Sequence, residues 1–133
     1  MILVDSSVWS EFFSSHSSRH QVHLGELIRL SDAVGIPGPV VQEVLQGIRE
    51  EGTFHQVADS LNRFPVVHAT TPTYVLAARL YRVLGAQGLR VPPGDLTIAA
   101  ISIESSHELY TLDRHFQHIA PHSTLRLYHP QLS

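Results

Sequence analysis

The segment VPPGDLTIAAISIESSHELYTLDRHF, residues 91–116, decides the fold class of this chain. Pro92, Pro93 and Gly94 open a run that predicts a helix, and HELYTL after it predicts a short strand. An aspartate marks each boundary: Asp95 opens the helix and Asp113 follows the strand. A helix that leads into a strand is the repeating unit of parallel sheets. The segment therefore predicts an α/β fold with acids at its turns.

The rest of the chain extends this pattern. Met1–Val4 predicts a first buried strand, after which Asp5 stands where the strand should end. AVGIP (33–37) and FPVVH (64–68) predict two more strands, and STLRLYH (123–129) predicts a last strand at an edge. Segments with a helical pattern separate the first four of these five predicted strands, counting HELYTL as the fourth. We expect one domain over residues 1–133: a three-layer α/β/α sandwich around a mostly parallel sheet of about five short strands.

Composition excludes several kinds of chemistry. All nine basic residues are arginine, and the chain has no cysteine. The absence of lysine excludes P-loop phosphate binding and Schiff-base catalysis, and argues against phosphatases and receivers that pair an aspartate with lysine. The absence of cysteine excludes disulfides and thiolate zinc sites. No leader and no apolar run of membrane-spanning length are visible, so we expect a cytoplasmic protein without a membrane partner.

Four acids are expected at one edge of the sheet. Asp5 and Asp113 follow strands, Asp95 opens a helix, and Glu43 lies early in the helix after the second strand. Taken singly, each aspartate fits a helix N-cap and Glu43 fits a solvated side chain. Taken together, four converging carboxylates repel one another unless a cation or shared protons offset them. Mg²⁺ or Mn²⁺ suits an all-oxygen site of this kind.

The motifs ILVDSSVW, VVQEVLQG, PPGDLTIAAIS and LYTLDRHF, in this order, carry a resemblance to a known family. From Ile2 to about Tyr128 the chain resembles the PIN-domain ribonucleases and, more narrowly, the VapC-type toxins of type II (VapBC) toxin–antitoxin modules. The resemblance implies a PIN-like fold and a Mg²⁺-dependent endoribonuclease, with Mn²⁺ able to substitute. It also implies an RNA substrate (such as tRNA or another structured RNA), a cognate VapB-type antitoxin and a homodimer.

The resemblance also assigns residues. It implies that Asp5, Glu43, Asp95 and Asp113 form the metal and catalytic site, with Ser7 and Thr111 as supporting hydroxyls. Ser7 also fits a helix cap and Thr111 an ordinary strand residue. A bound cation would activate water for attack on phosphorus, so no protein nucleophile is needed.

Two further groups of residues are open to interpretation. Arg90 and Arg114 flank two of the acids and are candidates for RNA contact, since the guanidinium fork suits phosphate; they equally fit surface ion pairs. His16, His20 and His23 would share one helix face, but SSHSSRH (14–20) favours an exposed loop over a transition-metal site.

Three functions remain open at the level of sequence. The first is the toxin ribonuclease. The second is a PIN nuclease with another role, in RNA processing or on DNA. The third is a catalytically silent PIN binding module, against which the four intact acids argue.

Overall fold

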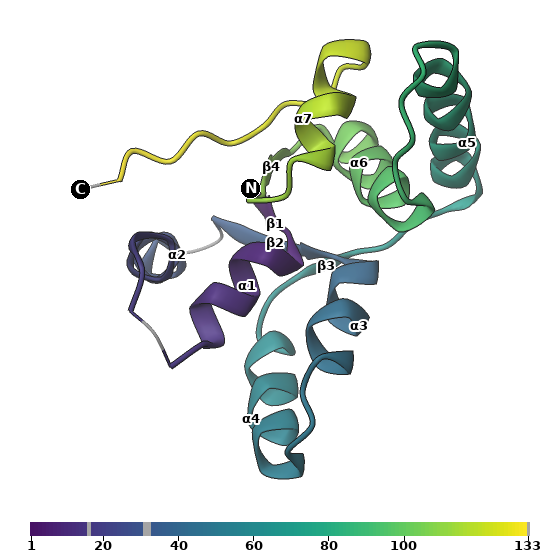
Figure 1. Ribbon diagram of the computed structural model, residues 1–133. Coiled ribbons are helices and arrows are strands. Elements are labelled where there is room, and N and C mark those ends of the chain that lie inside the picture. The colour runs from purple at the N-terminus through teal and green to yellow at the C-terminus, as the bar shows by residue number, and fades with distance from the viewer. Residues whose placement is uncertain (16, 31–32, 133) are drawn as a thin grey trace.

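The computed structural model describes residues 1–15, 17–30 and 33–132 and has a parallel sheet at its centre (Figure 1). The sheet contains four strands in the order β3-β2-β1-β4. Their bounds are β1 Ile2–Val4, β2 Val34–Pro37, β3 Val66–Val67 and β4 Glu108–Tyr110. Every strand pair in it is parallel, which confirms the predicted α/β class.

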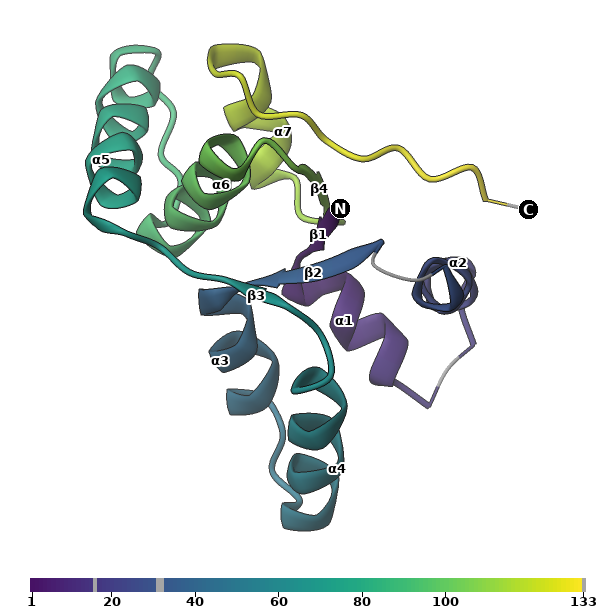
Figure 2. The same ribbon diagram turned by 180° about the vertical axis from the view of Figure 1, so that it is seen from behind.

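Helices connect the strands and cover both faces of the sheet. In Figure 1 the helices α5, α6 and α7 lie above the strands, and α1, α3 and α4 lie below them, as the reverse view in Figure 2 confirms. The helices are α1 Ser6–Phe13, α2 Arg19–Arg29, α3 Gly38–Gln46, α4 Glu51–Leu61, α5 Thr71–Ala86, α6 Pro93–Ser105 and α7 His115–Ile119; a 3₁₀ turn, Ala120–His122, follows.

Helix α6 is the central helix of the upper layer. Pro93 occupies its first position, where a missing N–H costs nothing, and the chain leaves it at Ser106, whose φ of 58° ends the helical run. A consecutive run of its residues, 98–102, is buried. A helix that is apolar around most of its circumference must be enclosed, and α6 packs against α5, α3, α7 and the sheet.

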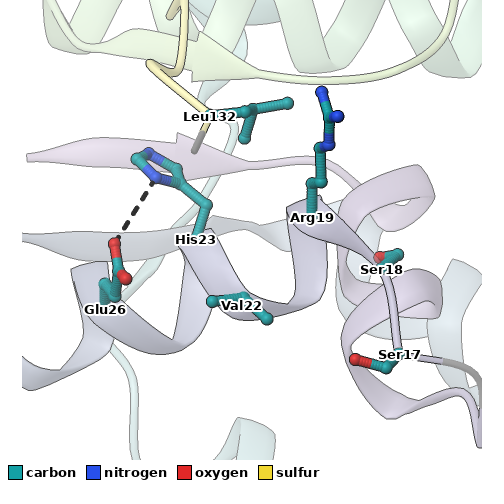
Figure 3. Close-up of a pocket in the computed structure, with 7 residues that line it drawn as sticks. All are labelled: Ser17, Ser18, Arg19, Val22, His23, Glu26 and Leu132. Carbon is teal, nitrogen blue, oxygen red and sulfur yellow. Dashed lines mark ion pairs between the residues drawn. The ribbon is translucent and has the colours of Figure 1, made fainter.

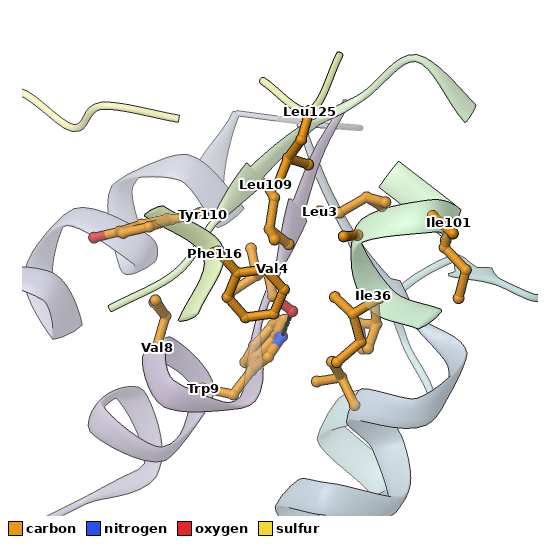
Figure 4. Packing of buried hydrophobic residues seen from close by; sticks show 14 of the residues in the cluster. Leu3, Val4, Val8, Trp9, Ile36, Ile101, Leu109, Tyr110, Phe116 and Leu125 are labelled. Atoms are coloured by element: carbon orange, nitrogen blue, oxygen red, sulfur yellow. Dashed lines mark hydrogen bonds between the residues drawn. The ribbon is translucent and has the colours of Figure 1, made fainter. Parts of the chain in front are cut away.

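The core fills the space between the sheet and the helices, as Figure 4 shows for its central part. Trp9 is fully buried and its indole N–H donates to the carbonyl of Val4 at 3.0 Å. Its ring lies 5.1 Å from that of Phe64 and 5.9 Å from that of Phe12. Leu3, Leu109 and Phe116, from three different elements, have no exposed surface. Trp9 thus fixes the start of α1 against the end of β1.

Two sequence predictions need correction. The sheet has four strands rather than about five, because STLRLYH contributes only a single parallel bridge, Leu109↔Leu127. The mixed polarity of that segment gives it too little apolar surface to extend the pairing. The second correction concerns SSHSSRH: α2 begins at Arg19, so His20 is helical, and Ser18 caps the helix by accepting from the N–H of Gln21 at 3.0 Å. His16 lies outside the described residues.

Among the described residues, no helix combines the length and the apolar content that crossing a membrane would require.

Candidate functional site

The strand register brings Asp5 and Thr111 together. Val4 pairs with Tyr110 as the last residue pair of β1 and β4, and the N–H of Asp5 donates to the carbonyl of Tyr110 at 2.9 Å. The next residue of each chain segment, Asp5 and Thr111, therefore lies at the same carboxyl edge of the sheet. This is the edge at which open parallel sheets carry their functional side chains.

Two hydroxyl groups hold the Asp5 carboxylate. The hydroxyl of Thr111 donates to Asp5 Oδ2 at 2.7 Å and that of Ser7 donates to the same oxygen at 2.9 Å. Each hydroxyl in turn accepts a backbone N–H: Ser7 from Leu112 at 2.9 Å and Thr111 from Asp113 at 3.0 Å. Each hydroxyl thus accepts one backbone N–H and donates one hydrogen bond to Asp5. Asp5 is 3% exposed, and this network orients it.

Asp95, Asp113 and His115 form a second part of the site. The Nδ1 atom of His115 lies 2.8 Å from Asp95 Oδ2 and 3.3 Å from Asp113 Oδ1. The backbone N–H of His115 also donates to Asp113 Oδ1 at 2.9 Å. One atom from each of the three side chains lies within 4.8 Å of the other two, an arrangement that could hold a metal ion. The first residue of α7 thus contacts the first turn of α6.

Glu43 reaches the same edge from α3. A Cβ atom on Gly94 would lie 3.7 Å from Glu43 Oε2, so Glu43 contacts the first turn of α6. Burial raises the pKa of Glu43 above its usual 4.5, and the neighbouring carboxylates Asp5, Asp95 and Asp113 raise it further against an opposing hydrogen bond from Ser6. Glu43 is therefore neither fully solvated nor remote from the aspartates.

Asp95 experiences the same repulsion. Burial raises the pKa of Asp95 above its usual 3.8, and Asp113 and Asp5 act in the same direction, while the hydrogen bond and positive charge of His115 oppose them. Within the described residues, the ion-pair contacts of these aspartates are those with His115. The carboxylates of Asp5, Glu43, Asp95 and Asp113 are thus close enough to repel one another.

These donors fit a hard divalent cation. Carboxylate oxygens are the ligands that Mg²⁺ and Mn²⁺ take most readily in proteins. Both hydrogen bonds to Asp5 from the described side chains go to Oδ2, which leaves Oδ1 without a side-chain donor among them. Among the described residues, the side chains whose ligand atoms already lie within coordination distance of one another are Asp95, Asp113 and His115. Metal binding by Asp5 and Glu43 stays a prediction.

The capping alternatives fare differently at the three aspartates. Asp5 occupies the N-cap position of α1 but its side chain makes no capping hydrogen bond there. Asp95 is the third residue of α6, whose N-cap is Pro92. Asp113 does accept the N–H of His115 at the start of α7. Helix capping alone therefore explains neither Asp5 nor Asp95. The hydroxyl of Ser7 donates to the Asp5 carboxylate and does not cap a helix.

The two candidate arginines are both exposed. Arg114 is the N-cap residue of α7 and borders a depression of about 550 Å³, whose other lining residues include Asp113 and His115. Arg90 lies in the connection between α5 and α6. Neither arginine forms an ion pair in the described part of the chain, so no contact there supports the alternative that they serve in surface ion pairs. A role for them in RNA contact stays a prediction.

Another cavity, of about 300 Å³, lies away from the acids. It is bordered by the start of α2 and by Leu132 (Figure 3). Figure 3 shows His23 and Glu26 on one turn of α2, where the imidazole and the carboxylate lie 3.9 Å apart. None of the four acids lines this cavity, so it is separate from the acidic site.

His115 and Ser6 belong to the site but carry no role in the sequence prediction. His115 lies two residues after Asp113, and this spacing could have predicted its place in the site. An aspartate side chain at the start of a helix reaches the backbone N–H two residues later. Ser6 adjoins Asp5, yet its bond to Glu43 joins α1 to α3 and depends on the tertiary fold.

Comparison with known proteins identifies the family and the fold. The family model described as PIN domain matches residues 2–121. Ribonuclease VapC11 of Mycobacterium tuberculosis is 28% identical over 123 residues, which cover 90% of this chain and 92% of that protein.

Two solved structures share the fold at lower identity. VapBC2 from Rickettsia felis, bound to a DNA fragment from its promoter, has a TM-score of 0.79 at 20% identity, with 96% of this chain and 98% of the other covered. FitAcB from Neisseria gonorrhoeae has a TM-score of 0.75 at 20% identity, with 97% of each chain covered. With the acids gathered beyond the parallel strands and a family model spanning most of its length, this chain belongs to the PIN-domain family.

Proposed function

We propose that this protein is a metal-dependent endoribonuclease, formed by a single PIN domain, and the toxin of a type II toxin–antitoxin module. One observation carries the proposal: Asp5, Glu43, Asp95 and Asp113 converge from four separate segments onto one edge of the sheet. Such an arrangement is costly without a function, because each carboxylate raises the ionisation cost of the others.

The residues of the chain have distinct tasks in this proposal. Ser7 and Thr111 fix the orientation of Asp5, and His115 fixes that of Asp95. Orientation matters because a reacting group displaced by about 1 Å can lose about 100-fold in rate. When bound, a divalent cation would polarise the phosphoryl oxygen, activate water and offset the negative charge of the site.

Substrate and partners follow from the relatives. The relatives include VapC ribonucleases, and the structural neighbours include toxins solved with their antitoxins. We infer an RNA substrate, with Arg90 and Arg114 as contacts for its phosphates, and a VapB-type antitoxin. The exposed rings of Tyr74 and Tyr81 on α5, beside a depression of about 440 Å³, are the place where we expect a second copy of the chain to pack.

The proposal is tested with purified protein and a pool of structured RNAs. Wild type and Asp95→Asn are incubated with Mg²⁺, with Mn²⁺ and with EDTA, and the products are sequenced at their ends. Discrete products that require both the metal and Asp95 are the expected result, and their ends identify the cleavage sites. Equal cleavage by the two proteins, or cleavage that persists in EDTA, would reject the proposal.

The same assay separates the other PIN functions. Single-stranded and flap DNA are included as substrates, and cleavage of DNA in preference to RNA would assign the nuclease to another role. Binding of RNA without cleavage by a folded, metal-loaded protein would identify a silent binding module.

A further inference from the structure

The site contains a nitrogen donor that an all-oxygen magnesium site does not use. His115 begins α7, and its imidazole Nδ1 lies between two carboxylates, 2.8 Å from Asp95 Oδ2 and 3.3 Å from Asp113 Oδ1. The side chain is 42% exposed, so water does reach the ring. Nδ1 is nevertheless held at the acids and not in solvent.

The spacing of these atoms matches the edge of a metal coordination shell. For metal–ligand distances of about 2.1 Å, neighbouring ligand atoms of an octahedral ion lie about 3.0 Å apart. The distances from Nδ1 to the two carboxylate oxygens lie on either side of that value. An ion could therefore take one atom from each of the three side chains without a large rearrangement of the ring.

The surrounding structure holds His115 in place. Its own N–H donates to Asp113 Oδ1, and Phe116, the next residue, is fully buried against the core. The backbone of residue 115 is thus fixed at both ends, and before a metal binds the hydrogen bond to Asp95 sets the ring orientation. A ligand held in this way loses little freedom when an ion binds.

We propose that His115 is a ligand of the metal through Nδ1, and that it makes the site select Mn²⁺ over Mg²⁺. This inference rests on the proposed function, because it needs the four acids to hold a cation. Imidazole suits transition metals, whereas Mg²⁺ is bound almost entirely through oxygen. Before a metal binds, Nδ1 donates to Asp95 Oδ2, so coordination replaces the Nδ1 proton with the ion and leaves the ring proton on Nε2. The residue that separates the two metals is therefore His115 and not one of the acids.

Pulsed electron paramagnetic resonance of bound Mn²⁺ tests the assignment directly. A coordinated imidazole adds nitrogen modulation to the electron spin echo, and labelling histidine with ¹⁵N changes the modulation frequency. The samples are full-length wild type, His115→Gln, and His118→Gln as a control on the same helix, where His118 is exposed. We expect the modulation in wild type and His118→Gln and its loss in His115→Gln.

Metal titrations of the same proteins supply a second readout. His115→Gln should weaken Mn²⁺ binding about 10-fold or more, within the range seen when a partner of a metal site is removed. Mg²⁺ binding should change much less, so the ratio of the two dissociation constants moves toward one. Circular dichroism checks that each variant is folded. The electron paramagnetic resonance spectrum of wild type tests the proposal even if a variant fails to fold.

The outcomes separate this inference from the proposed function. Bound Mn²⁺ without nitrogen modulation in wild type, or modulation that persists in His115→Gln, would overturn the role of His115 while leaving a nuclease with an oxygen-only site. Failure of wild type to bind either metal would overturn both proposals.

Discussion

Tyr110 and Thr111 are consecutive residues that belong to two different polar regions. Thr111 donates to Asp5 and is part of the acidic edge, defined here as Asp5, Glu43, Asp95 and Asp113. Tyr110 belongs to the His–Tyr cluster, defined as His20, His23, Tyr110 and Tyr128. There His20 Nδ1 lies 2.6 Å from the Tyr110 hydroxyl, and His23 Nε2 lies 2.7 Å from that of Tyr128. Adjacent residues near a strand end point to opposite faces, which separates the two regions.

The two regions differ in how their polar groups are matched. In the His–Tyr cluster one nitrogen of each imidazole meets one tyrosine hydroxyl, and the rings of Tyr110 and Tyr128 lie 5.1 Å apart. Burial raises the pKa of Tyr110 to about 12, so the phenol keeps its proton. At the acidic edge, carboxylates face carboxylates. A matched cluster stabilises the fold, whereas like charges held together indicate a ligand of opposite charge.

The largest expected effect is the loss of cleavage on substitution in the acidic edge. Asp5→Asn should lower the rate by at least about 100-fold, beyond the loss of an outer-shell partner of a metal. The amide oxygen can still accept from Ser7 and Thr111, so the fold should be retained. Removing one charge also relieves repulsion, and metal-free stability should not fall.

Single-turnover cleavage and urea denaturation of the same preparation check this prediction. A variant that cleaves like wild type would show that Asp5 serves the structure alone.

The second effect is stabilisation by a cation. A ligand bound only by the folded state, at 100 times its dissociation constant, adds about 2.7 kcal/mol to the free energy of unfolding. For a domain of this size the melting temperature should rise by roughly 10 °C with Mg²⁺ or Mn²⁺. Asp113→Asn should lose most of the shift, as differential scanning fluorimetry will measure.

Tyr110→Phe is the matched control for the cation effect, since it alters the other region. An equal shift in Asp113→Asn and in wild type would place any bound ion elsewhere.

The third effect concerns stability and belongs to the His–Tyr cluster. Tyr110→Phe leaves His20 Nδ1 without its hydroxyl in a half-buried position, which should cost about 1–2 kcal/mol of unfolding free energy. Cleavage per folded molecule should stay unchanged. Tyr74→Phe, at a ring that is 58% exposed, should cost almost nothing. Loss of cleavage in Tyr110→Phe would mean that the two regions are coupled.

The smallest effect is a dependence of metal-free stability on pH. The pKa values of Glu43 and Asp95 are raised in the folded state, so below the ordinary carboxyl range both states are protonated and the two groups cost nothing. As the pH rises above that range, the unfolded chain releases these protons first, and stability falls until the folded carboxyls have ionised as well.

Denaturation in EDTA at a series of pH values measures this slope. Glu43→Gln should flatten it and Glu51→Gln, at an exposed acid, should not. A slope that is identical in wild type and Glu43→Gln would indicate that repulsion at the acidic edge is weak.

The sequence by itself determined the α/β class, the parallel connections and the positions of the four acids along the chain. These follow from local patterns: apolar runs predict strands, proline and glycine mark helix ends, and an aspartate after a strand predicts a functional edge. Local patterns failed at STLRLYH, because a marginal strand forms only if its neighbour offers enough pairing surface. They failed again at SSHSSRH, where Arg19 and His20 are helical and His20 contacts a tyrosine ninety residues away.

Only the tertiary structure decided which polar groups lie at the acidic edge and which are paired in the His–Tyr cluster. The bond from Thr111 to Asp5 spans 106 positions of sequence and depends on the pairing of β1 with β4. The contact of His115 with Asp95 depends on how α7 packs against α6. His20 and His23 of α2 and His115 of α7 are the same residue type, yet the first two meet tyrosine hydroxyls and the third contacts carboxylates. Charge and hydrogen bonding act over a few ångströms in space, so the role of a titratable residue is fixed by its neighbours in the fold.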